Sequence, residues 1–241
     1  MNGPKRAMIM AAGLGTRMRP MTDDKPKPLV AVAGKTLIDH ALDRLIAVGV
    51  TLAVVNVHYK AEMLKTHLAK RTDIEICFSE EGSALLGTGG GVVNALAHFG
   101  DEPFFVMNSD TVWVEGYGHA LERMKERWNA DSMDALLLMA SMVTAIGYEG
   151  SGDFNMDPDG HLTRAAELRL TPFAYPGVQI VSPKLFASAP VGAFSTNRVW
   201  DVAIKAKRLF GIRLDGVWIH VGTPEAVREA EAFLAEQPAV R

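Results

Sequence analysis

Short runs of apolar residues alternate along the chain with longer stretches in which apolar residues recur at helical spacing. This pattern predicts buried strands at 6–12, 52–57, 75–79, 103–107 and 134–140. Between these strands it predicts helices at 36–48, 60–70, 88–98 and 117–128. Such alternation is typical of an α/β fold, in which helices cover both faces of a parallel or mostly parallel sheet.

The regular alternation of predicted strands and helices ends after residue 140. Residues 147–160 are rich in glycine and aspartate, which predicts loops and short antiparallel strands. Further strands are expected at 177–181 and 209–214, and further helices at 198–207 and 224–235. No internal repeat, low-complexity tract or linker separates the two halves, so we expect a single α/β domain over residues 1–241.

Composition agrees with a globular domain. Of the 241 residues, 48% are hydrophobic and 22% are charged, and the net charge is -3, which gives no electrostatic reason to expect nucleic-acid binding. The single cysteine, Cys77, excludes an intramolecular disulfide framework and a multi-cysteine zinc site. Neither an apolar run of about 18 residues nor a basic-then-apolar leader occurs. We therefore expect a cytoplasmic protein with no membrane partner.

A glycine-rich loop follows the first predicted strand, with the sequence MAAGLGTRMRP at 10–20. Such a loop leaves backbone N–H groups free to bind phosphate oxygens. Four basic residues crowd the same region: Arg17, Arg19, Lys25 and Lys27. The alternative is an ordinary strand-to-helix turn with solvated charges, but this concentration of positive charge favours an anionic ligand.

Two familiar phosphate motifs are missing from this loop. A dinucleotide fingerprint would need a third glycine where Met18 stands, and no Gly-Lys-Ser/Thr string of a P-loop occurs. A nicotinamide dehydrogenase and a P-loop kinase are therefore both disfavoured.

The loop resembles the signature of the sugar-phosphate nucleotidyltransferases, as do the strings PKPL at 26–29 and GK at 34–35, and the resemblance extends over 5–235. It implies a Rossmann-like domain with a mixed, mostly parallel sheet and a small antiparallel sugar-binding part. Residues 1–140 would mainly bind the nucleotide and 141–241 mainly the sugar phosphate. Arg17 would hold the triphosphate and Lys27 would neutralise the α-phosphate. The loop residues implied to bind the nucleoside triphosphate are Ala11, Ala12, Gly13, Gly15, Thr16 and Arg17.

Asp110 closely follows the apolar strand predicted at 103–107. An aspartate at this place often only forms a turn. The carboxyl edge of a parallel sheet is, however, where α/β folds bind ligands, and hard carboxylate oxygens suit Mg²⁺. In the resemblance Asp110 matches the metal-binding aspartate of the family, and nearby Asn108 is assigned to the sugar phosphate.

The string WIHVGTPE at 218–225 resembles the closing Asp-Val-Gly-Thr motif of the family, whose aspartate commonly supplies a second metal ligand. His220 stands at that position, and imidazole is a poor match for magnesium. Three interpretations remain open for His220: contact with phosphate or metal-bound water, coordination of a softer ion, or packing alone. Asp215 is a less favoured substitute carboxylate.

The string EEGSALLGTGGG at 80–91 places three successive glycines at a predicted helix start. This is either a flexible helix entry or a close-fitting surface for a base or ribose. It resembles the Leu-Leu-Glu-Thr-Gly-Gly-Gly pattern of the branch that uridylylates N-acetylmuramic acid 1-phosphate and of related guanylyl- and heptose-specific enzymes. Gly87 replaces the usual glutamate. The residues assigned to the nucleotide here are Glu81, Thr88, Gly89 and Gly90.

The second half is expected to recognise the sugar. The segment GDF at 152–154, the segment YPGVQI at 175–180 and the string NVHY at 56–59 resemble the same branch. Asp153 and Gly177 are therefore assigned to the sugar phosphate, although loop capping explains Asp153 almost as well.

These observations favour an enzyme that joins a nucleoside triphosphate to a sugar 1-phosphate and releases pyrophosphate. The resemblance favours UTP and N-acetylmuramic acid 1-phosphate, as in peptidoglycan recycling, with Arg17, Lys27, Asp110 and Mg²⁺ as the catalytic groups. Guanylyl transfer to mannose or heptose 1-phosphate is the alternative within the class. A non-catalytic nucleotide- or sugar-binding regulator also remains open, because His220 and Gly87 depart from the family pattern. A monomer or small homo-oligomer is expected.

Overall fold

The computed structural model describes residues 3–164 and 169–237, so the two ends and residues 165–168 of the predicted 1–241 domain lie outside the described residues. The strands are β1 (Arg6–Met10), β2 (Ala31–Val32), β3 (Lys35–Thr36), β4 (Leu52–Val57), β5 (Glu75–Glu80), β6 (Phe104–Asn108), β7 (Thr111–Glu115), β8 (Ala135–Ser141), β9 (Phe154–Met156), β10 (Leu162–Arg164), β11 (Phe173–Ala174), β12 (Val178–Val181), β13 (Leu209–Arg213) and β14 (Gly216–His220). The α-helices are α1 (Leu37–Ala47), α2 (Ala61–Leu68), α3 (Gly87–Ala95), α4 (Ala120–Arg127), α5 (Asn197–Lys205) and α6 (Pro224–Glu236). Short 3₁₀ turns are η1 (Thr16–Met18), η2 (Lys27–Leu29), η3 (Leu96–His98) and η4 (Pro183–Phe186).

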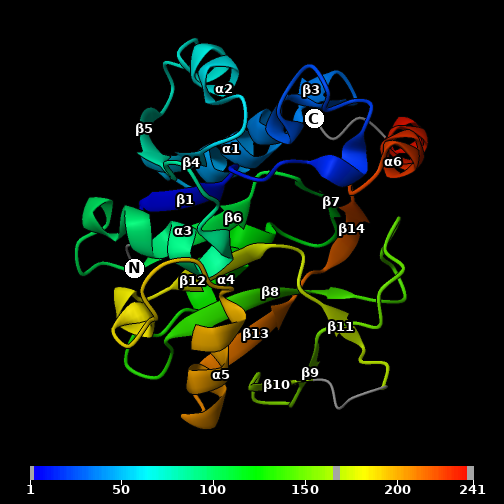
Figure 1. Cartoon of the computed structure of the whole chain (residues 1–241). Helices are drawn as coiled ribbons and strands as arrows, with labels where there is room; N and C mark the ends of the chain where they lie inside the picture. Colours follow the sequence, from blue (N-terminus) through cyan, green and yellow to red (C-terminus); the bar gives the residue numbers. More distant parts are fainter. Residues whose placement is uncertain (1–2, 165–168, 238–241) are drawn as a thin grey trace.

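One sheet organises the molecule, in the order β10-β9-β11-β8-β12-β6-β1-β4-β5, with β13 also paired to β8 (Figure 1). Strands β5, β4, β1 and β6 are mutually parallel. Strand β12 lies antiparallel between β6 and β8, so β8 and its parallel partner β13 share the direction of β6. Strands β11, β9 and β10 extend β8 as a small antiparallel region. The predicted mixed, mostly parallel sheet is confirmed, as are the short antiparallel strands of the second half.

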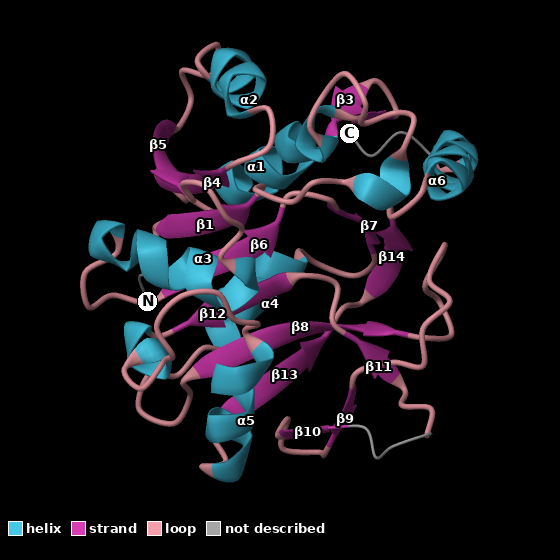
Figure 2. Cartoon of the chain, viewed as in Figure 1, coloured by secondary structure: helices cyan, strands magenta, loops and turns pink. Residues whose placement is uncertain are grey.

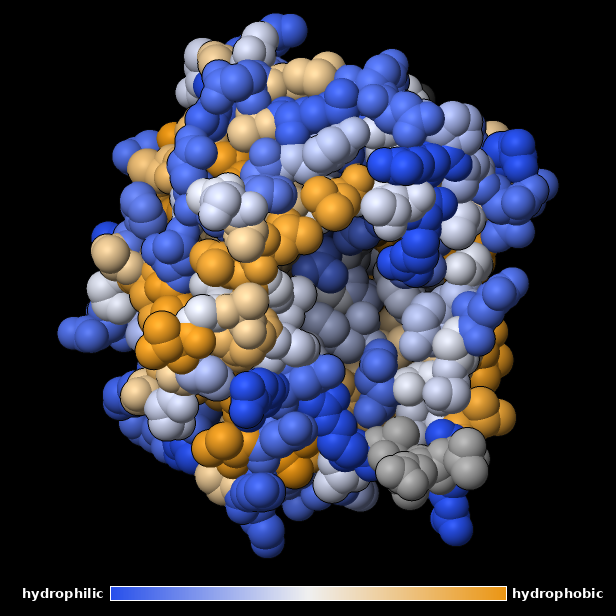
Figure 3. Space-filling view, viewed as in Figure 1, coloured by the Kyte–Doolittle hydropathy of each residue, from blue (hydrophilic) through white to orange (hydrophobic). Residues whose placement is uncertain are grey.

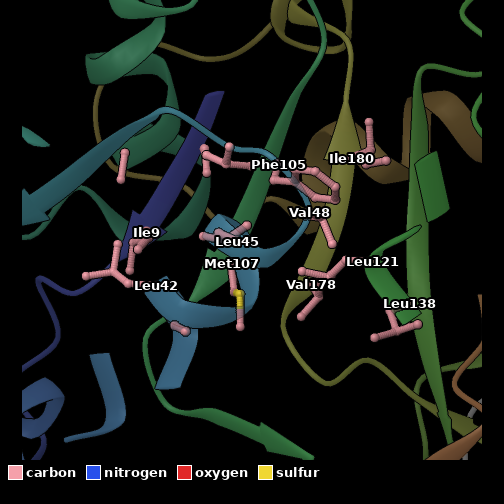
Figure 4. Close-up of a cluster of buried hydrophobic side chains, with 14 of the residues drawn as sticks. Ile9, Leu42, Leu45, Val48, Phe105, Met107, Leu121, Leu138, Val178 and Ile180 are labelled. Atoms are coloured by element: carbon pink, nitrogen blue, oxygen red, sulfur yellow. The ribbon is translucent and has the colours of Figure 1, made fainter. Parts of the chain in front are cut away.

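Helices cover both faces of this sheet, as the sequence predicts (Figure 2). On β1, Ala7 and Ile9 face a core that contains residues of α1 and α4, whereas Met8 faces a second core that contains residues of α3 and α5. The same alternation places Phe105 in the first core and Phe104 in the second. Figure 4 shows part of the first core, where Leu42 and Leu45 of α1 lie near the strand residues Ile9, Phe105 and Met107.

Strands β7 and β14 form a separate two-stranded antiparallel ribbon that the sequence analysis did not predict. Its register pairs Thr111 with His220, so Asp110 and His220, which come from distant motifs, lie at the same end of the ribbon. The ribbon packs on α6 in a third core, through Val112, Ile219 and Val227 among others. This packing, together with the Thr223 cap that accepts the Ala226 N–H, fixes the segment that bears His220.

Several element boundaries differ from the predicted ones for local reasons. The first strand ends at Met10, because Ala11 and Ala12 already belong to the glycine-rich loop. Helix α4 begins only at Ala120, since Gly118 has a φ of 77° and His119 is extended. Within the described residues, no helix has the length and apolar character needed to cross a membrane.

The position of Phe105 gives a first prediction. Its side chain is fully buried in the central strand β6, so Phe105→Ala should lower the free energy of unfolding by about 3–5 kcal/mol through lost burial and the cavity left behind. Urea denaturation followed by circular dichroism measures this change. Val191→Ala, at a fully exposed side chain, is the control and should change stability by no more than about 0.5 kcal/mol. Equal stability of the two variants would contradict this account of the core.

Candidate active site

A cavity of about 250 Å³ opens where the parallel strands β1, β4 and β6 end. Figure 3 shows the corresponding face of the molecule hollowed at its centre. Neighbouring parallel strands bring their carboxyl ends to one edge, and this edge is where α/β folds bind ligands. The lining comes from the glycine-rich loop, from Lys27 and Pro28, from the ends of the three strands, and from the segment between β5 and the first turn of α3. The lining residues are Met10, Ala11, Ala12, Gly13, Gly15, Lys27, Pro28, Asn56, Glu81, Leu85, Gly87, Thr88, Asn108, Ser109 and Asp110.

Lys27 and Asp110 meet in this cavity. The Lys27 Nζ lies 2.5 Å from Asp110 Oδ2, and the two side chains are only 13% and 28% exposed. Gly15 allows the close approach of the lysine, because a Cβ added there would lie 3.1 Å from Lys27 Cβ and the φ of Gly15 is 65°. The cavity therefore holds a cation and a carboxylate side by side, able to serve an anionic ligand and a metal cation respectively.

Thr16 and Arg17 lie in η1 and are exposed, outside the cavity lining. The charge of Arg17 nevertheless acts on His220, as does that of Lys27. Arg17 is therefore close enough to His220 for its charge to act there, and its assignment to the triphosphate stays a prediction.

A buried amide links the two loops that line the cavity. The Asn56 Oδ1 accepts the Ala11 N–H at 2.6 Å, and its Nδ2 donates to Glu81 Oε1 at 2.6 Å. The second Glu81 oxygen accepts the Leu86 N–H at 2.8 Å. Asn56 and Glu81 are both almost completely buried, and Gly91 leaves room for them, since a Cβ there would lie 2.7 Å from Glu81 Oε1. The carboxylate of Glu81, assigned to the nucleotide from the sequence, thus fixes the segment up to Leu86 directly and the glycine-rich loop through Asn56.

The start of α3 packs against the segment around Phe194. The Phe194 carbonyl accepts the N–H groups of Gly89 and Gly90, at 2.9 and 3.3 Å, and the Thr88 hydroxyl accepts the Thr196 N–H at 2.9 Å. A Cβ at Gly89 would collide with the Phe194 ring. Thr88 and Gly87 line the cavity, but Gly89 and Gly90 line neither of the two cavities described here. Their assignment to the nucleotide stays a prediction, and this packing by itself accounts for both glycines.

His220 lies near the Lys27–Asp110 pair. Burial lowers the pKa of His220 below its ordinary value; the Asp110 carboxylate opposes this effect, and Lys27 and Arg17 reinforce it. The ring is therefore neutral at neutral pH. It stacks edge-on against Tyr148 and Trp218, with centroids 5.8 and 5.3 Å away.

Asp215 lies at the other end of the ribbon, where its carboxylate accepts the Tyr117 N–H. Of the two residues considered for the second ligand position, His220 is thus the one near Asp110.

A second cavity, of about 240 Å³, adjoins the first and shares Met10, Thr88 and Asn108 with it. Its remaining lining comes from both halves of the chain: Val106, Asp153, Phe154, Arg164, Tyr175, Gln179, Ser195, Thr196, Asn197 and Trp200. Among the residues assigned to the sugar phosphate, Asn108 and Asp153 line this cavity. Gly177 lies behind Asn108, whose N–H donates to the Gly177 carbonyl at 2.7 Å.

Several side chains of the second cavity are fixed by hydrogen bonds. The Trp200 Nε1 donates to Gln179 Oε1 at 3.0 Å, which orients the amide and leaves its Nε2 as a donor. Asp153 Oδ2 accepts the Tyr175 N–H at 2.8 Å, so Asp153 also has the loop-capping role considered as the alternative. Burial raises the pKa of the Tyr175 hydroxyl, and the Asp153 charge adds to this effect, so the hydroxyl keeps its proton.

One group of three potential metal ligands comes together within the described residues, and the sequence analysis did not predict it. Ligand atoms of Asp157, Asp159 and His161 all lie within 4.8 Å of one another, on the turn between β9 and β10. None of the three lines either cavity. The Asp157 carboxylate accepts the N–H groups of Asp159 and His161, so the turn itself accounts for this cluster.

Comparison with known families agrees with this geometry. Residues 6–148, which include the glycine-rich loop, Lys27 and Asp110, match the family described as "Nucleotidyl transferase". The chain belongs to the nucleotidyl transferase family. A relative from Caulobacter vibrioides, an N-acetylmuramate alpha-1-phosphate uridylyltransferase, is 44% identical over 97% of this chain and 98% of its own. A relative of the same name from Neisseria meningitidis serogroup B is 32% identical over 95% and 97%.

Solved structures agree on the fold of this nucleotidyl transferase. The inositol-1-phosphate CTP transferase from T. maritima superimposes with a TM-score of 0.79 at 16% identity, over 99% of each chain. At this identity the likeness shows a shared fold. The resemblance inferred from the loop motifs is thus confirmed at the level of family and fold.

The buried amide of this nucleotidyl transferase gives a second prediction. Asn56→Ala removes the partner of the Ala11 N–H and of the Glu81 carboxylate. Loss of each of these two buried hydrogen bonds should lower the free energy of unfolding by about 1–3 kcal/mol. The substitution should also weaken nucleotide binding, because the glycine-rich loop loses the hydrogen bond from its Ala11 N–H to Asn56. Thermal melting and titration calorimetry with UTP measure the two effects.

Asn94→Ala is the matched control, because that amide also bonds across to β5 but is exposed. It should change stability by no more than about 0.5 kcal/mol. Unchanged nucleotide affinity in Asn56→Ala would show that this contact does not position the loop.

Proposed function

We propose that this nucleotidyl transferase couples UTP to N-acetylmuramic acid 1-phosphate, giving UDP-N-acetylmuramic acid and pyrophosphate. The observation that supports this most strongly is the Lys27–Asp110 pair, which lies close to Asn108, a residue that both cavities share. Two ligands in adjoining cavities would meet at this pair. Two relatives that carry this activity in their names match nearly the full chain.

The chemistry needs charge compensation more than proton transfer. The anionic phosphate oxygen of the sugar attacks the α-phosphorus of UTP; a new P–O bond forms and the bond to the pyrophosphate oxygen breaks. The nucleophile is already ionised, so no general base is required. The chain must bring two polyanions together and stabilise the charge on the phosphoryl oxygens. Lys27 would do so beside the α-phosphate and Arg17 on the outer phosphates.

The proposed reaction uses Mg²⁺, and Asp110 would be the ligand of the ion. One carboxylate is sufficient, since Mg²⁺ in proteins commonly takes one or two carboxylates and completes its shell with phosphates and water. When bound, the ion would draw negative charge from the phosphate oxygens. Neutral His220 offers a softer nitrogen nearby, suited to contact with phosphate or metal-bound water.

The second cavity suits an N-acetylated sugar. The rings of Tyr175 and Trp200 offer apolar surface for a sugar face or an acetyl methyl group, with the buried Phe154 ring behind them, and the fixed Gln179 amide offers a donor for a carbonyl oxygen. Residues 1–140 would mainly hold the nucleotide and 141–241 the sugar phosphate, within one domain. We also infer a cytoplasmic enzyme of peptidoglycan recycling, acting as a monomer or small homo-oligomer.

A non-catalytic regulator is less well supported by the geometry. One argument for it is Gly87, which stands where relatives of this branch have glutamate. Gly87 has a φ of 71°, and a Cβ there would lie 2.8 Å from the Phe194 carbonyl oxygen. The backbone therefore requires glycine at this position, and the missing carboxylate is no sign of a decayed site.

A panel of substrates tests the proposal. Each nucleoside triphosphate is combined with the 1-phosphates of N-acetylmuramic acid, N-acetylglucosamine, glucose, mannose and a heptose, with Mg²⁺, and pyrophosphate release is measured. UTP with N-acetylmuramic acid 1-phosphate should give the highest kcat/KM. Preference for GTP with mannose or heptose 1-phosphate would support the guanylyl alternative. Nucleotide binding without turnover in any pair would favour the regulator.

Asp110 gives the sharpest single-residue prediction. Asp110→Asn keeps the side-chain shape but removes the charge, so turnover should fall by roughly 10²–10³. Asp215→Asn is the matched control, because Asp215 lies at the far end of the ribbon and should be dispensable for turnover. Near-normal turnover of purified Asp110→Asn would remove the proposed metal ligand from the mechanism.

A further inference from the structure

We propose that Arg164 binds a carboxylate on the sugar and so makes the second cavity selective for an acidic sugar 1-phosphate. This inference rests on the proposed function and assigns one of its specificity determinants. N-acetylmuramic acid differs from N-acetylglucosamine by a lactyl ether that ends in a carboxylate. A nucleotidyl transferase that prefers the former must recognise that group.

Arg164 is held so that part of its guanidinium remains available. It ends β10, opposite Phe154 of β9, and its Nε donates to Asp201 Oδ1 at 2.9 Å. Its Nη2 makes a longer bond, of 3.4 Å, to the Asn197 carbonyl. Within the described residues Nη1 has no protein acceptor, and the side chain is 32% exposed. A guanidinium has five N–H donors in a fixed plane, so the Nη1 edge can still pair with a carboxylate.

Two aromatic rings hold the guanidinium in place. Its Cζ lies 4.7 Å from the centroid of Phe154 and 5.7 Å from that of Trp200. Both rings line the second cavity with Arg164, and Figure 1 shows β10 at the lower edge of the sheet, in the part of the molecule that also contains α5. An arginine held by rings and by Asp201 loses little further entropy when it binds an anion.

Arg164 is the positive group with which an anion in this cavity could pair. Among the described residues that line it, Arg164 is the only Lys or Arg, and Asp153 is the only acidic side chain. One Asp153 oxygen is already engaged by the Tyr175 N–H. Asp201, the partner of Arg164, does not line the cavity and is half exposed, so water screens its charge.

The anion that Arg164 meets is the carboxylate and not the sugar phosphate. The phosphate must reach the Lys27–Asp110 pair, beside the shared residues Thr88 and Asn108. Arg164 lines only the second cavity, on the side formed by β9, β10 and α5. A sugar anchored by its phosphate at the junction would therefore present its other substituents to Arg164.

Three substrates with UTP test this assignment: the 1-phosphates of N-acetylmuramic acid, of its uncharged lactyl amide, and of N-acetylglucosamine. The native enzyme should prefer the first over the other two. Arg164→Gln should lower kcat/KM for the first by on the order of 10- to 100-fold, the range of one lost charge-assisted hydrogen-bond pair, mainly through KM. It should leave kcat/KM for the two substrates that lack the carboxylate nearly unchanged.

Arg208→Gln is the matched control, because Arg208 also donates its Nε to an aspartate, Asp134, is equally exposed, and lines neither cavity. It should not alter the preference. If Arg164→Gln folds poorly by thermal melting, Arg164→Lys replaces it and should retain only part of the preference.

The outcomes separate this inference from the proposed function. Equal losses with all three substrates would mean that Arg164 contacts the phosphate or supports the fold, which would overturn the inference. Unchanged preference in Arg164→Gln would overturn it as well, with uridylyl transfer intact. A native enzyme that turns over none of the three, or prefers a neutral sugar, would overturn the proposed function itself.

Discussion

Two opposite charges, on Lys27 and Asp110, meet where water has limited access. Each would be costly to bury alone, and removal of one partner leaves the other uncompensated. Their meeting requires three segments to converge: the loop that contains Gly15, the 3₁₀ turn η2 that follows it, and the distant end of β6. The parallel register of β1 with β6 brings the first and last of these segments together. The cavity, its polarity and its two adjoining compartments all depend on this convergence.

Hydrogen bonds fix several segments of the cavity wall. Asn56 spans from the glycine-rich loop to Glu81, and Glu81 continues to Leu86. Phe194 then joins the next residues, Gly89 and Gly90, to the second half of the chain. A ligand entering the cavity meets prearranged groups, and prearrangement is the main source of electrostatic stabilisation in group transfer.

Much of this arrangement could be predicted from the sequence. Apolar periodicity identified the main parallel strands of the sheet, since those strands are buried on both faces. The basic cluster with its PKPL string identified Lys27, and the position after a buried strand identified Asp110. The β7–β14 ribbon was missed because its pairing joins residues far apart in the chain, and pairing leaves no local pattern. The structural role of Asn56 could have been suspected, since a lone amide in an apolar strand needs buried partners. The packing of Phe194 on Gly89 could not, because nothing local marks a contact across so long a separation.

The hydrogen bonds around Phe194 also limit how relatives of this chain could come to accept other sugar 1-phosphates. The Phe194 carbonyl caps the first turn of α3, and Gly192 approaches Gly90 closely. An insertion between Gly192 and Phe194 would remove the cap of α3, and it would disturb the first cavity, which the start of α3 lines, at the same time. The hairpin of β9 and β10 pairs with β11 along one edge, and its turn also bonds to β13, where the Gly211 N–H donates to the Gly160 carbonyl at 2.8 Å. The side chains of residues 157–159 in this turn are exposed. Substrate range can therefore diverge through exposed side chains of this hairpin, but its length and its core residues Phe154 and Leu162 are held by the rest of the fold.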